Sequence, residues 1–464
     1  MNDTKTIEKT ACIKNMKNLF SASGLVLLFV FGGTAVAQSY FDKIATPAEL
    51  QTVTPNIAPT PVDTNQVERV DIGTPGLPPE PSGADKYNMA LGPVHFGIAA
   101  GIGLMYNDNI TLAPRDQAIS DFAVLPSLTI DATYQISELN TLRLSLGASY
   151  AAYFNHSEFD TRGILLSPNS AIAFTVHVSN IAITFRDRFS YQEDGYNNPV
   201  IGGVGSVRNS GNELYRYFEN QVGVQVDWAV NANLKITGGY DHYNLWTFSS
   251  QFSQLEDSID TIYLKPGYAI TPAITVGVNT SVSFVRYNES IQNDGNSYMV
   301  GPFADLSLSQ NTHLYLEGGY QSFEFQNNGI IADNSNSNSW YARVDLANRP
   351  SEAFSHRLSF SKSAETGYGT NYYTLYHLEY AADWKIMQNL SLAPSAFYEH
   401  YSTSGSFGFQ GETGNRYGGG VGLRYILTPS VTLGLDYRYV SKDSNLPGLN
   451  YTQNLVLLSL YYNF

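Results

Sequence analysis

Apolar and polar residues alternate along most of the chain, from Val94 to the last residue, Phe464. Successive side chains of a β-strand point to opposite faces, so each alternating segment has one apolar face and one polar or small face. The alternation is most regular at residues 142–150, 221–228 and 275–284. A tilted strand needs roughly 9–11 residues to cross a bilayer. The pattern therefore predicts membrane-crossing β-strands, although the strands of a soluble β-sandwich would also alternate.

Short turns and longer polar loops separate these segments in strict succession. The turns are expected at residues 137–140, 179–180, 231–233, 271–273, 310–312, 349–351, 388–389 and 428–430. The loops are expected at 107–120, 156–168, 193–213, 248–257, 288–296, 326–338, 402–416 and 441–450, with a tighter one near Gly369. The resulting hairpins repeat about every forty residues. This arrangement predicts an all-β fold, a transmembrane antiparallel up-and-down β-barrel of about 18 strands (16 being the alternative), with short periplasmic turns and longer extracellular loops.

The first 37 residues have the features of a signal peptide. Four lysines precede an apolar run at Leu25–Phe31, and residues 35–37 are Ala-Val-Ala, with small residues where a signal peptidase reads them. The apolar run is shorter than the ~20 residues of a membrane-spanning helix, which argues against a retained anchor. We therefore expect cleavage after Ala37. The single cysteine, Cys12, lies in this leader, so the mature chain would have no thiol.

Residues 38–93 are rich in proline and lack apolar periodicity. This composition predicts a flexible periplasmic extension, with a plug inside the barrel as the alternative. The barrel itself is expected to cover residues 94–464. No part of it has the pattern of a plug, although the glycine-rich loop at 193–213 could fold inward.

The end of the chain has the pattern of an outer-membrane assembly signal. The last residue is aromatic, and the alternate positions before it are apolar, so that one face of the last segment carries Val456, Leu458, Leu460, Tyr462 and Phe464. This face resembles the C-terminal strand signal that the barrel assembly machinery recognises. Together with the leader, it predicts the outer membrane of a Gram-negative bacterium as the location.

Composition and charge fit such a barrel. Charged residues make up only 14% of the chain, whereas Tyr (33) and Phe (24) are abundant. The mean hydropathy of −0.18 is modest, as expected where only every second residue meets lipid. The net charge of −15 argues against nucleic-acid binding, which needs a basic surface. Lipopolysaccharide is the expected lipid partner; the acidic pairs at 193–194 and 256–257 either bind divalent cations that bridge it or are simply solvated.

Charges within the alternating segments fall on the polar face, because a charge facing lipid costs several kcal/mol at mid-membrane. The candidate pore-lining residues are Arg143, Arg186, Arg188, Asp227, Lys235, Asp241, Glu317, Arg343, Asp345, Glu379, Asp383, Arg424, Asp436 and Arg438. They form either a network of ion pairs on the inner wall or a constriction that sorts solutes. Arg186 and Arg188, two residues apart, are the best candidates for a basic ladder. Small residues on the same face predict room in the lumen: Gly147, Gly223, Gly277, Gly420, Gly422 and Gly434.

No catalytic motif emerges from the sequence. The histidines form no HExxH spacing, and there is no GxSxG sequence. Asp241-His242 and Glu399-His400 resemble catalytic pairs, but adjacent residues on a strand point to opposite faces. We therefore predict no enzyme activity, no metal site and no cofactor.

The segment Gly101–Thr111, with its Tyr106-Asn107-Asp108-Asn109 sequence, resembles the first strand and turn of an outer-membrane β-barrel porin family. The repeated hairpins and the terminal Phe464 are also similar, so the resemblance extends over residues 94–464. It implies a link to exopolysaccharide production and export, and it brings no catalytic residues.

Two functions of different classes follow from these patterns. The first is a pore for small solutes or for a secreted polysaccharide, since a barrel of about 18 strands generally encloses an aqueous lumen. The second is a non-conducting barrel with a structural or surface-interaction role. The pore is favoured because the inner face carries many small residues.

Overall fold

The computed structural model describes residues 89–464 except for 138, 168–169, 196–213, 249, 332, 368–369 and 406–410. The predicted signal peptide (1–37), residues 38–88 of the predicted extension, most of the loop at 193–213, and Gly369 lie outside the described residues. Within the described ranges, no helix is long and apolar enough to cross a bilayer.

The described chain consists almost entirely of β-strands, with two short 3-10 turns, η1 (Ser157–Phe159) and η2 (Ser250–Leu255). The strands are β1 (Met89–Leu91), β2 (Val94–Asn107), β3 (Asp121–Ser137), β4 (Asn140–Ser149), β5 (Ala152–Tyr153), β6 (Leu165–Leu166), β7 (Ala171–Val178), β8 (Ile181–Gly195), β9 (Leu214–Ala229), β10 (Leu234–Thr247), β11 (Asp257–Thr271), β12 (Ile274–Tyr287), β13 (Gly295–Ser309), β14 (Thr312–Phe325), β15 (Ser337–Ser351), β16 (Phe354–Thr366), β17 (Tyr372–Met387), β18 (Leu390–Thr403), β19 (Thr413–Thr428), β20 (Val431–Ser444) and β21 (Tyr451–Asn463).

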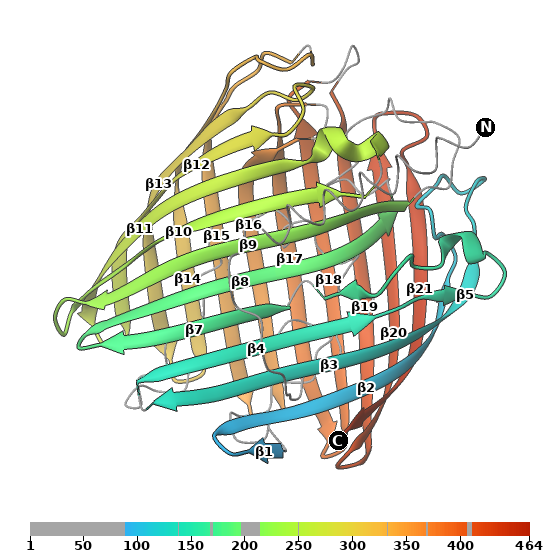
Figure 1. Cartoon of the computed structure of the whole chain (residues 1–464), viewed down its shortest axis with the longest axis horizontal. Coiled ribbons are helices and arrows are strands. Elements are labelled where there is room, and N and C mark those ends of the chain that lie inside the picture. Colours follow the sequence, from blue (N-terminus) through green and yellow to red (C-terminus); the bar gives the residue numbers. More distant parts are fainter. Residues whose placement is uncertain are drawn as a thin grey trace, which may run out of the picture. The chain divides into compact units, whose positions relative to one another are not determined.

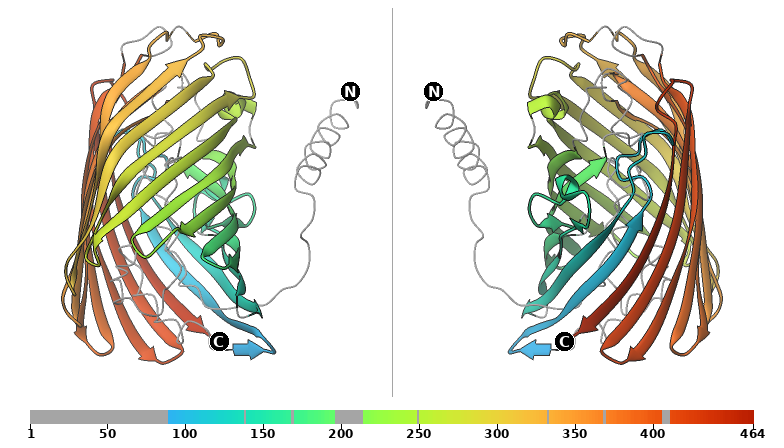
Figure 2. Two further views of the ribbon diagram at one scale, coloured as in Figure 1. Left: turned by 90° about the vertical axis from the view of Figure 1, so that its left-hand side faces the viewer. Right: turned by 90° about the vertical axis from the view of Figure 1, so that its right-hand side faces the viewer.

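The strands close into a barrel. Neighbouring strands pair antiparallel, and β2 also pairs with β21, from Ala99 opposite Asn463 to Asn107 opposite Leu455. Strand β1 pairs with β2 as a short hairpin arm, while β5 and β6 continue the lines of β4 and β7 where those strands are interrupted. The remaining 18 strands form a closed antiparallel barrel, which confirms the predicted fold class. Figure 1 shows β1 and the C-terminus at the end of the short turns, and Figure 2 shows the strands tilted around the barrel.

The two faces of the strands differ as the alternation predicts. On β21, Val456, Leu458 and Leu460 are exposed on the outside, whereas Leu455 and Leu457 are buried on the inside. The same alternation places aliphatic and aromatic side chains outward on the other long strands, including Ile262, Val300 and Trp340. A continuous apolar exterior of this kind suits the hydrocarbon core of a bilayer.

One turn lies later than predicted. The sequence placed it at residues 349–351, but β15 continues to Ser351, and the turn is formed by Glu352 and Ala353. The pairing between β15 and β16 is irregular between Asn348 and Ser351. Pro350 is tolerated there because it lies at the end of the strand, where a missing backbone N–H disrupts little pairing.

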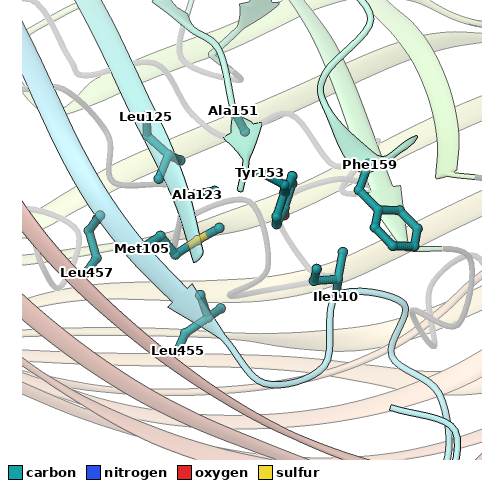
Figure 3. Close-up of a cluster of buried hydrophobic side chains, with 9 residues drawn as sticks. All are labelled: Met105, Ile110, Ala123, Leu125, Ala151, Tyr153, Phe159, Leu455 and Leu457. Carbon is teal, nitrogen blue, oxygen red and sulfur yellow. The ribbon is translucent and has the colours of Figure 1, made fainter. Parts of the chain in front are cut away.

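Two extracellular loops fold toward the inside of the barrel, which the sequence did not predict. A buried apolar cluster combines wall residues with loop residues (Figure 3). The wall contributes Met105, Ala123, Leu125, Leu455, Leu457 and, from β5, Tyr153; the segments after β2 and β4 contribute Ile110, Ala151 and Phe159. Leu112, from the first of these loops, packs on Val440 and Tyr451. The sequence offered only the loop at 193–213 as a segment that folds inward; the segments after β2 and β4 also pack against the inner wall.

Candidate functional site

The inner wall of the barrel is the candidate site, and the structure places all fourteen predicted pore-lining residues on it. They alternate along their strands with the outward side chains; Arg186, for example, follows Phe185, which is 52% exposed on the exterior. They come from many strands: Arg143 from β4, Arg186 and Arg188 from β8, Asp227 from β9, Lys235 and Asp241 from β10, Glu317 from β14, Arg343 and Asp345 from β15, Glu379 and Asp383 from β17, Arg424 from β19, and Asp436 and Arg438 from β20. Their role in conduction remains a prediction.

Arg186 and Arg188 have different environments. Arg186 forms an ion pair with Asp241: its Nη2 lies 2.7 Å from Oδ2, and its Nε donates to Oδ1 at 3.2 Å. Arg188 donates from Nη2 to the neutral Oε1 of Gln221 at 3.1 Å. Within this pair of neighbours the charge of Arg186 is thus balanced by a carboxylate, whereas Arg188 bonds an uncharged amide. The two arginines therefore do not form the predicted ladder of two equivalent positive charges.

We predict that Arg188→Gln shifts the ion selectivity of the channel toward cations, because a positive charge in a confined lumen raises the local concentration of anions. The matched control is the double change Arg186→Gln with Asp241→Asn, which removes an ion pair and leaves the net charge unchanged. Reversal potentials across a salt gradient would measure both. An unchanged reversal potential for Arg188→Gln would assign this side chain a structural role only.

A buried charged network joins β17, β18 and β19. Glu399 is completely buried and accepts hydrogen bonds from Arg416 Nε at 2.7 Å and His377 Nδ1 at 3.0 Å. On the other side of the imidazole, Nε2 lies 3.6 Å from the predicted wall residue Glu379. A buried carboxylate is stable only when it is paired and hydrogen-bonded in this way.

A second buried pair lies beside the first. Lys442 Nζ is 3.1 Å from Oε1 of Glu412, and both side chains are completely buried. The same carboxylate oxygen accepts from the Tyr401 hydroxyl at 2.6 Å and from Ser444 Oγ at 2.8 Å. This carboxylate therefore joins the ends of β18 and β20 to the start of β19.

Sequence reasoning missed these two networks because it assigned Arg416 and Lys442 to loops. The strands are longer than predicted: β19 begins at Thr413 and β20 continues to Ser444. The alternation itself could have found them. Arg416 lies an even number of residues from Arg424, and Lys442 from Arg438, so each shares the inward face of its strand. Glu399 had been considered only as a partner of its sequence neighbour.

Further ion pairs line the remaining wall. Asp345 forms two ion pairs: its Oδ2 lies 2.5 Å from Arg343 Nε, and its Oδ1 lies 2.7 Å from Arg357 Nη2. Toward the short-turn end, Lys235 pairs with Asp227 at 2.9 Å and Arg424 with Asp436 at 2.7 Å. Glu317 accepts from Asn279 at 2.8 Å and from the hydroxyls of Tyr315 and Tyr341. The inner wall thus satisfies many of its charges locally.

The inner-wall glycines do not leave empty space, contrary to the prediction. A Cβ on Gly223 would lie 1.9 Å from Oδ1 of Asp241, and one on Gly277 would lie 2.5 Å from the ring of Phe303. At Gly434, the Arg424 guanidinium and Ser459 Oγ occupy the corresponding space. These glycines let long neighbouring side chains lie flat against the wall, so they provide room for the polar network rather than for solute.

Four extracellular loops meet at one residue, Asp333. Its Oδ2 accepts from Ser404 Oγ at 2.6 Å and from the Asn371 backbone N–H at 2.8 Å, and Asn293 Nδ2 donates to its backbone carbonyl at 2.9 Å. Burial alone would raise the pKa of Asp333, but hydrogen bonds from Ser404, Asn371 and Ser335 lower it below its ordinary value. The loops that follow β12, β14, β16 and β18 are therefore tied together at the extracellular end.

The pairs that resemble catalytic dyads are separated by the barrel wall. Asp241 bonds Arg186 on the inside, whereas His242 bonds Asp260 on the outside at 2.7 Å. Glu399 is likewise inside, and His400 bonds Asn415 outside at 3.0 Å. Across the described ranges, no three His, Cys, Asp or Glu side chains are grouped to hold a metal ion.

The predicted assembly residues lie on the outer face of β21 and at the chain end. Their side chains are exposed there: Val456, Leu458, Leu460, Tyr462 and Phe464. The rings of Tyr462 and Phe464 contact edge-to-face at 4.9 Å, and the Phe464 N–H donates to the Ile98 carbonyl at 3.0 Å. The last residue is thus part of the closed seam between β21 and β2.

Comparison with solved structures gives several outer-membrane channels. One is OpdK from Pseudomonas aeruginosa with vanillate, at 10% sequence identity and a TM-score of 0.44, over 79% of this chain and 98% of that chain. Another is a BenF-like porin from Pseudomonas fluorescens, at 10% identity and a TM-score of 0.45, over 81% of this chain and 100% of that chain. A third is OccK2 (OpdF) from Pseudomonas aeruginosa in complex with glucuronate, at 10% identity and a TM-score of 0.44, over 79% of this chain and 97% of that chain. No curated protein matches the chain by sequence.

A family model described as "Putative beta-barrel porin 2" matches residues 261–464, from within β11 to the C-terminus. The match confirms the porin resemblance over this part of the chain; the segment 101–111 lies outside it. Porins are channels rather than enzymes. The closed barrel, its apolar exterior and this match identify the chain as an outer-membrane β-barrel with a porin-like channel fold, similar to that family over residues 261–464.

Proposed function

We propose that this barrel is a channel for polar solutes across the outer membrane, linked to the export of an exopolysaccharide. The observation that carries the proposal is the inner wall, where ion pairs such as Arg186–Asp241, Asp345–Arg357 and Arg424–Asp436 face a lumen enclosed by 18 strands. Such a wall favours water and polar solutes over apolar ones.

The link to polysaccharide rests on the resemblance and gains support from the chemistry of the wall. Aromatic rings lie among the charged groups: Lys265 Nζ is 4.7 Å and Arg343 Cζ is 5.7 Å from the ring centre of the half-buried Tyr315. Rings beside hydrogen-bonding groups offer both an apolar face and polar partners. A hydroxylated sugar ring, which also has apolar C–H faces, matches this combination.

A non-conducting barrel is the second candidate, and the inward loops favour it. Phe159 and Met105 are completely buried in the apolar cluster at the inner wall, and Asp333 ties four other loops together. These contacts hold loop residues against the inner wall and against one another at the extracellular end. Passage of a solute would have to go beside the cluster or require the loops to move.

Single-channel conductance of the purified protein in planar bilayers separates these candidates. We expect stable conductance that exopolysaccharide fragments block, because a glycan that enters the lumen displaces the ions. Conductance without blocking would leave a general solute pore. Absence of conductance in both the full-length protein and a variant lacking 38–88 would overturn the channel proposal.

We further predict that Phe159→Glu increases the conductance. The change puts a carboxylate into an apolar cluster, where an unpaired charge is strongly disfavoured, so the loop should leave the inner wall. Phe154→Glu is the matched control, because Phe154 lies in the same loop but is 62% exposed. Equal conductance of the two variants and the native protein would show that this loop does not narrow the pathway.

A further inference from the structure

The exterior carries a hydrogen-bonded motif that recurs in four hairpins. A tyrosine hydroxyl on one strand donates to an Asp or Asn side chain on the next strand: Tyr240 to Asp260 at 2.5 Å, Tyr320 to Asn338 at 2.7 Å, Tyr398 to Asn415 at 2.8 Å and Tyr437 to Asn454 at 2.9 Å. We call these the Tyr–Asx units. All four tyrosines are outward and exposed.

In three units, the residue two positions after the tyrosine binds the same Asx side chain. His242 contacts Asp260 at 2.7 Å, Ser322 donates to Asn338 at 2.8 Å, and His400 contacts Asn415 at 3.0 Å. In the fourth unit the Asn454 amide donates instead to Asp108 at 2.6 Å. Each unit therefore presents hydroxyl, amide, imidazole or carboxylate functions to the surroundings of the barrel, although Ser322 itself is buried beneath Tyr320 and Asn338.

The units mark a level on the barrel wall. Along β14 the outward residues Leu314 and Leu316 precede Tyr320, and Ser322 follows it toward the extracellular end. From the start of β14 to Tyr320 the strand rises roughly 20 Å along the membrane normal at a tilt of about 40°. An apolar band is about 25 Å tall. By the same count Tyr398 lies at about 20 Å, and Tyr240 and Tyr437 at about 15 Å. The units thus lie in the part of the apolar exterior nearer the long loops, and in three of them the next outward residue is polar: His242, Ser322 or His400.

The lipid on that side of a Gram-negative outer membrane is lipopolysaccharide, whose headgroup carries glucosamine hydroxyls, amides and phosphates. The Tyr–Asx units offer donors and acceptors that match the hydroxyls and amides. Between two units, Arg286 is half-buried at the extracellular end of β12, where its Nη1 is 3.4 Å from Asn296 Oδ1. It supplies a cation at the same level, which matches a phosphate.

We propose that the Tyr–Asx units form a docking belt for the glucosamine headgroups of lipopolysaccharide. The apolar exterior below the belt packs against the acyl chains, and the belt binds the sugars directly above them. The belt is independent of what passes through the lumen, because its side chains all point away from it.

The test removes the four hydroxyls together, in the variant with Tyr→Phe at 240, 320, 398 and 437. Lipopolysaccharide retained per barrel is measured after detergent extraction from outer membranes, and heat-modifiable migration confirms that the barrel is folded. The matched control removes outward tyrosine hydroxyls at the periplasmic end, by Tyr268→Phe with Tyr425→Phe. We expect at least a threefold loss of retained lipopolysaccharide in the belt variant and none in the control.

Equal retention in the native protein and the belt variant would overturn the proposal, and so would an equal loss in the control. Refolding into phosphatidylethanolamine vesicles distinguishes the lipid source. If the belt variant loses as large a fraction of its folded yield there as it loses of retained lipopolysaccharide, the units have a general interfacial role and are not a lipopolysaccharide site. If the fourfold variant does not fold, Asn338→Leu alone disrupts one complete unit and should still lower the retained lipopolysaccharide.

Discussion

Replacing Arg416 with methionine is expected to destabilise the folded barrel by about 3–5 kcal/mol, the usual cost of breaking a buried ion pair from one side. The guanidinium lies 2.7 Å from the carboxylate of Glu399, and both side chains are essentially inaccessible to water. Without Arg416, His377 is the remaining hydrogen-bond donor to the carboxylate among the residues that the structure describes. Urea titration of the barrel in lipid vesicles, followed by heat-modifiable migration, would measure the loss as a lower unfolding midpoint.

Two further variants make this prediction specific. Lys385→Met removes an exposed inner-wall cation, so its effect should stay within about 0.5 kcal/mol. The double variant Arg416→Met with Glu399→Leu removes both charges and should recover most of the stability, because an apolar replacement of a buried pair is often neutral. A native-like unfolding midpoint for Arg416→Met alone would contradict the assigned role.

The architecture could be predicted from sequence because it depends on a period-two pattern. Alternation fixes which side chains share a face, so it separated Asp241 from His242 and placed Arg186 on the inner wall without knowledge of the pairing. Most turns were also predictable, since Pro and Asn residues interrupt the pattern at regular intervals. Errors at strand ends, as at Arg416, arose where polar residues continue the alternation beyond the apolar band.

The contacts inside the barrel could not be predicted in the same way. Which carboxylate meets which guanidinium depends on register between strands far apart in the sequence, as for Arg186 and Asp241. The inward loops escaped detection because isolated apolar residues such as Ile110 and Phe159 have no periodicity. Gly223 was predicted to leave space; only the structure reveals that the Asp241 carboxylate occupies it.

The seam between the first and last barrel strands gives the second large expected effect. Asp108 accepts from the backbone N–H and from the side-chain amide of Asn454, both at 2.6 Å. On the inner side of the same seam, Gln453 Nε2 donates to Asn107 Oδ1 at 3.2 Å and to the Asn109 carbonyl at 3.0 Å. The Tyr106-Asn107-Asp108-Asn109 sequence thus fastens the extracellular end of β2 to β21.

We predict that Asp108→Ala destabilises the barrel by about 2–4 kcal/mol. It removes two hydrogen bonds to a charged acceptor, each worth about 1.5–3 kcal/mol, but Asp108 is only half-buried, so water replaces part of the loss. Asp108→Asn retains one acceptor oxygen and should have a smaller effect. Asp443→Ala is the control, because it removes an exposed carboxylate at the extracellular end of β20, away from the seam. The urea midpoint of heat-modifiable migration measures all three variants. Equal midpoints for Asp108→Ala and Asp443→Ala would mean that backbone pairing between β2 and β21 holds the seam without this motif.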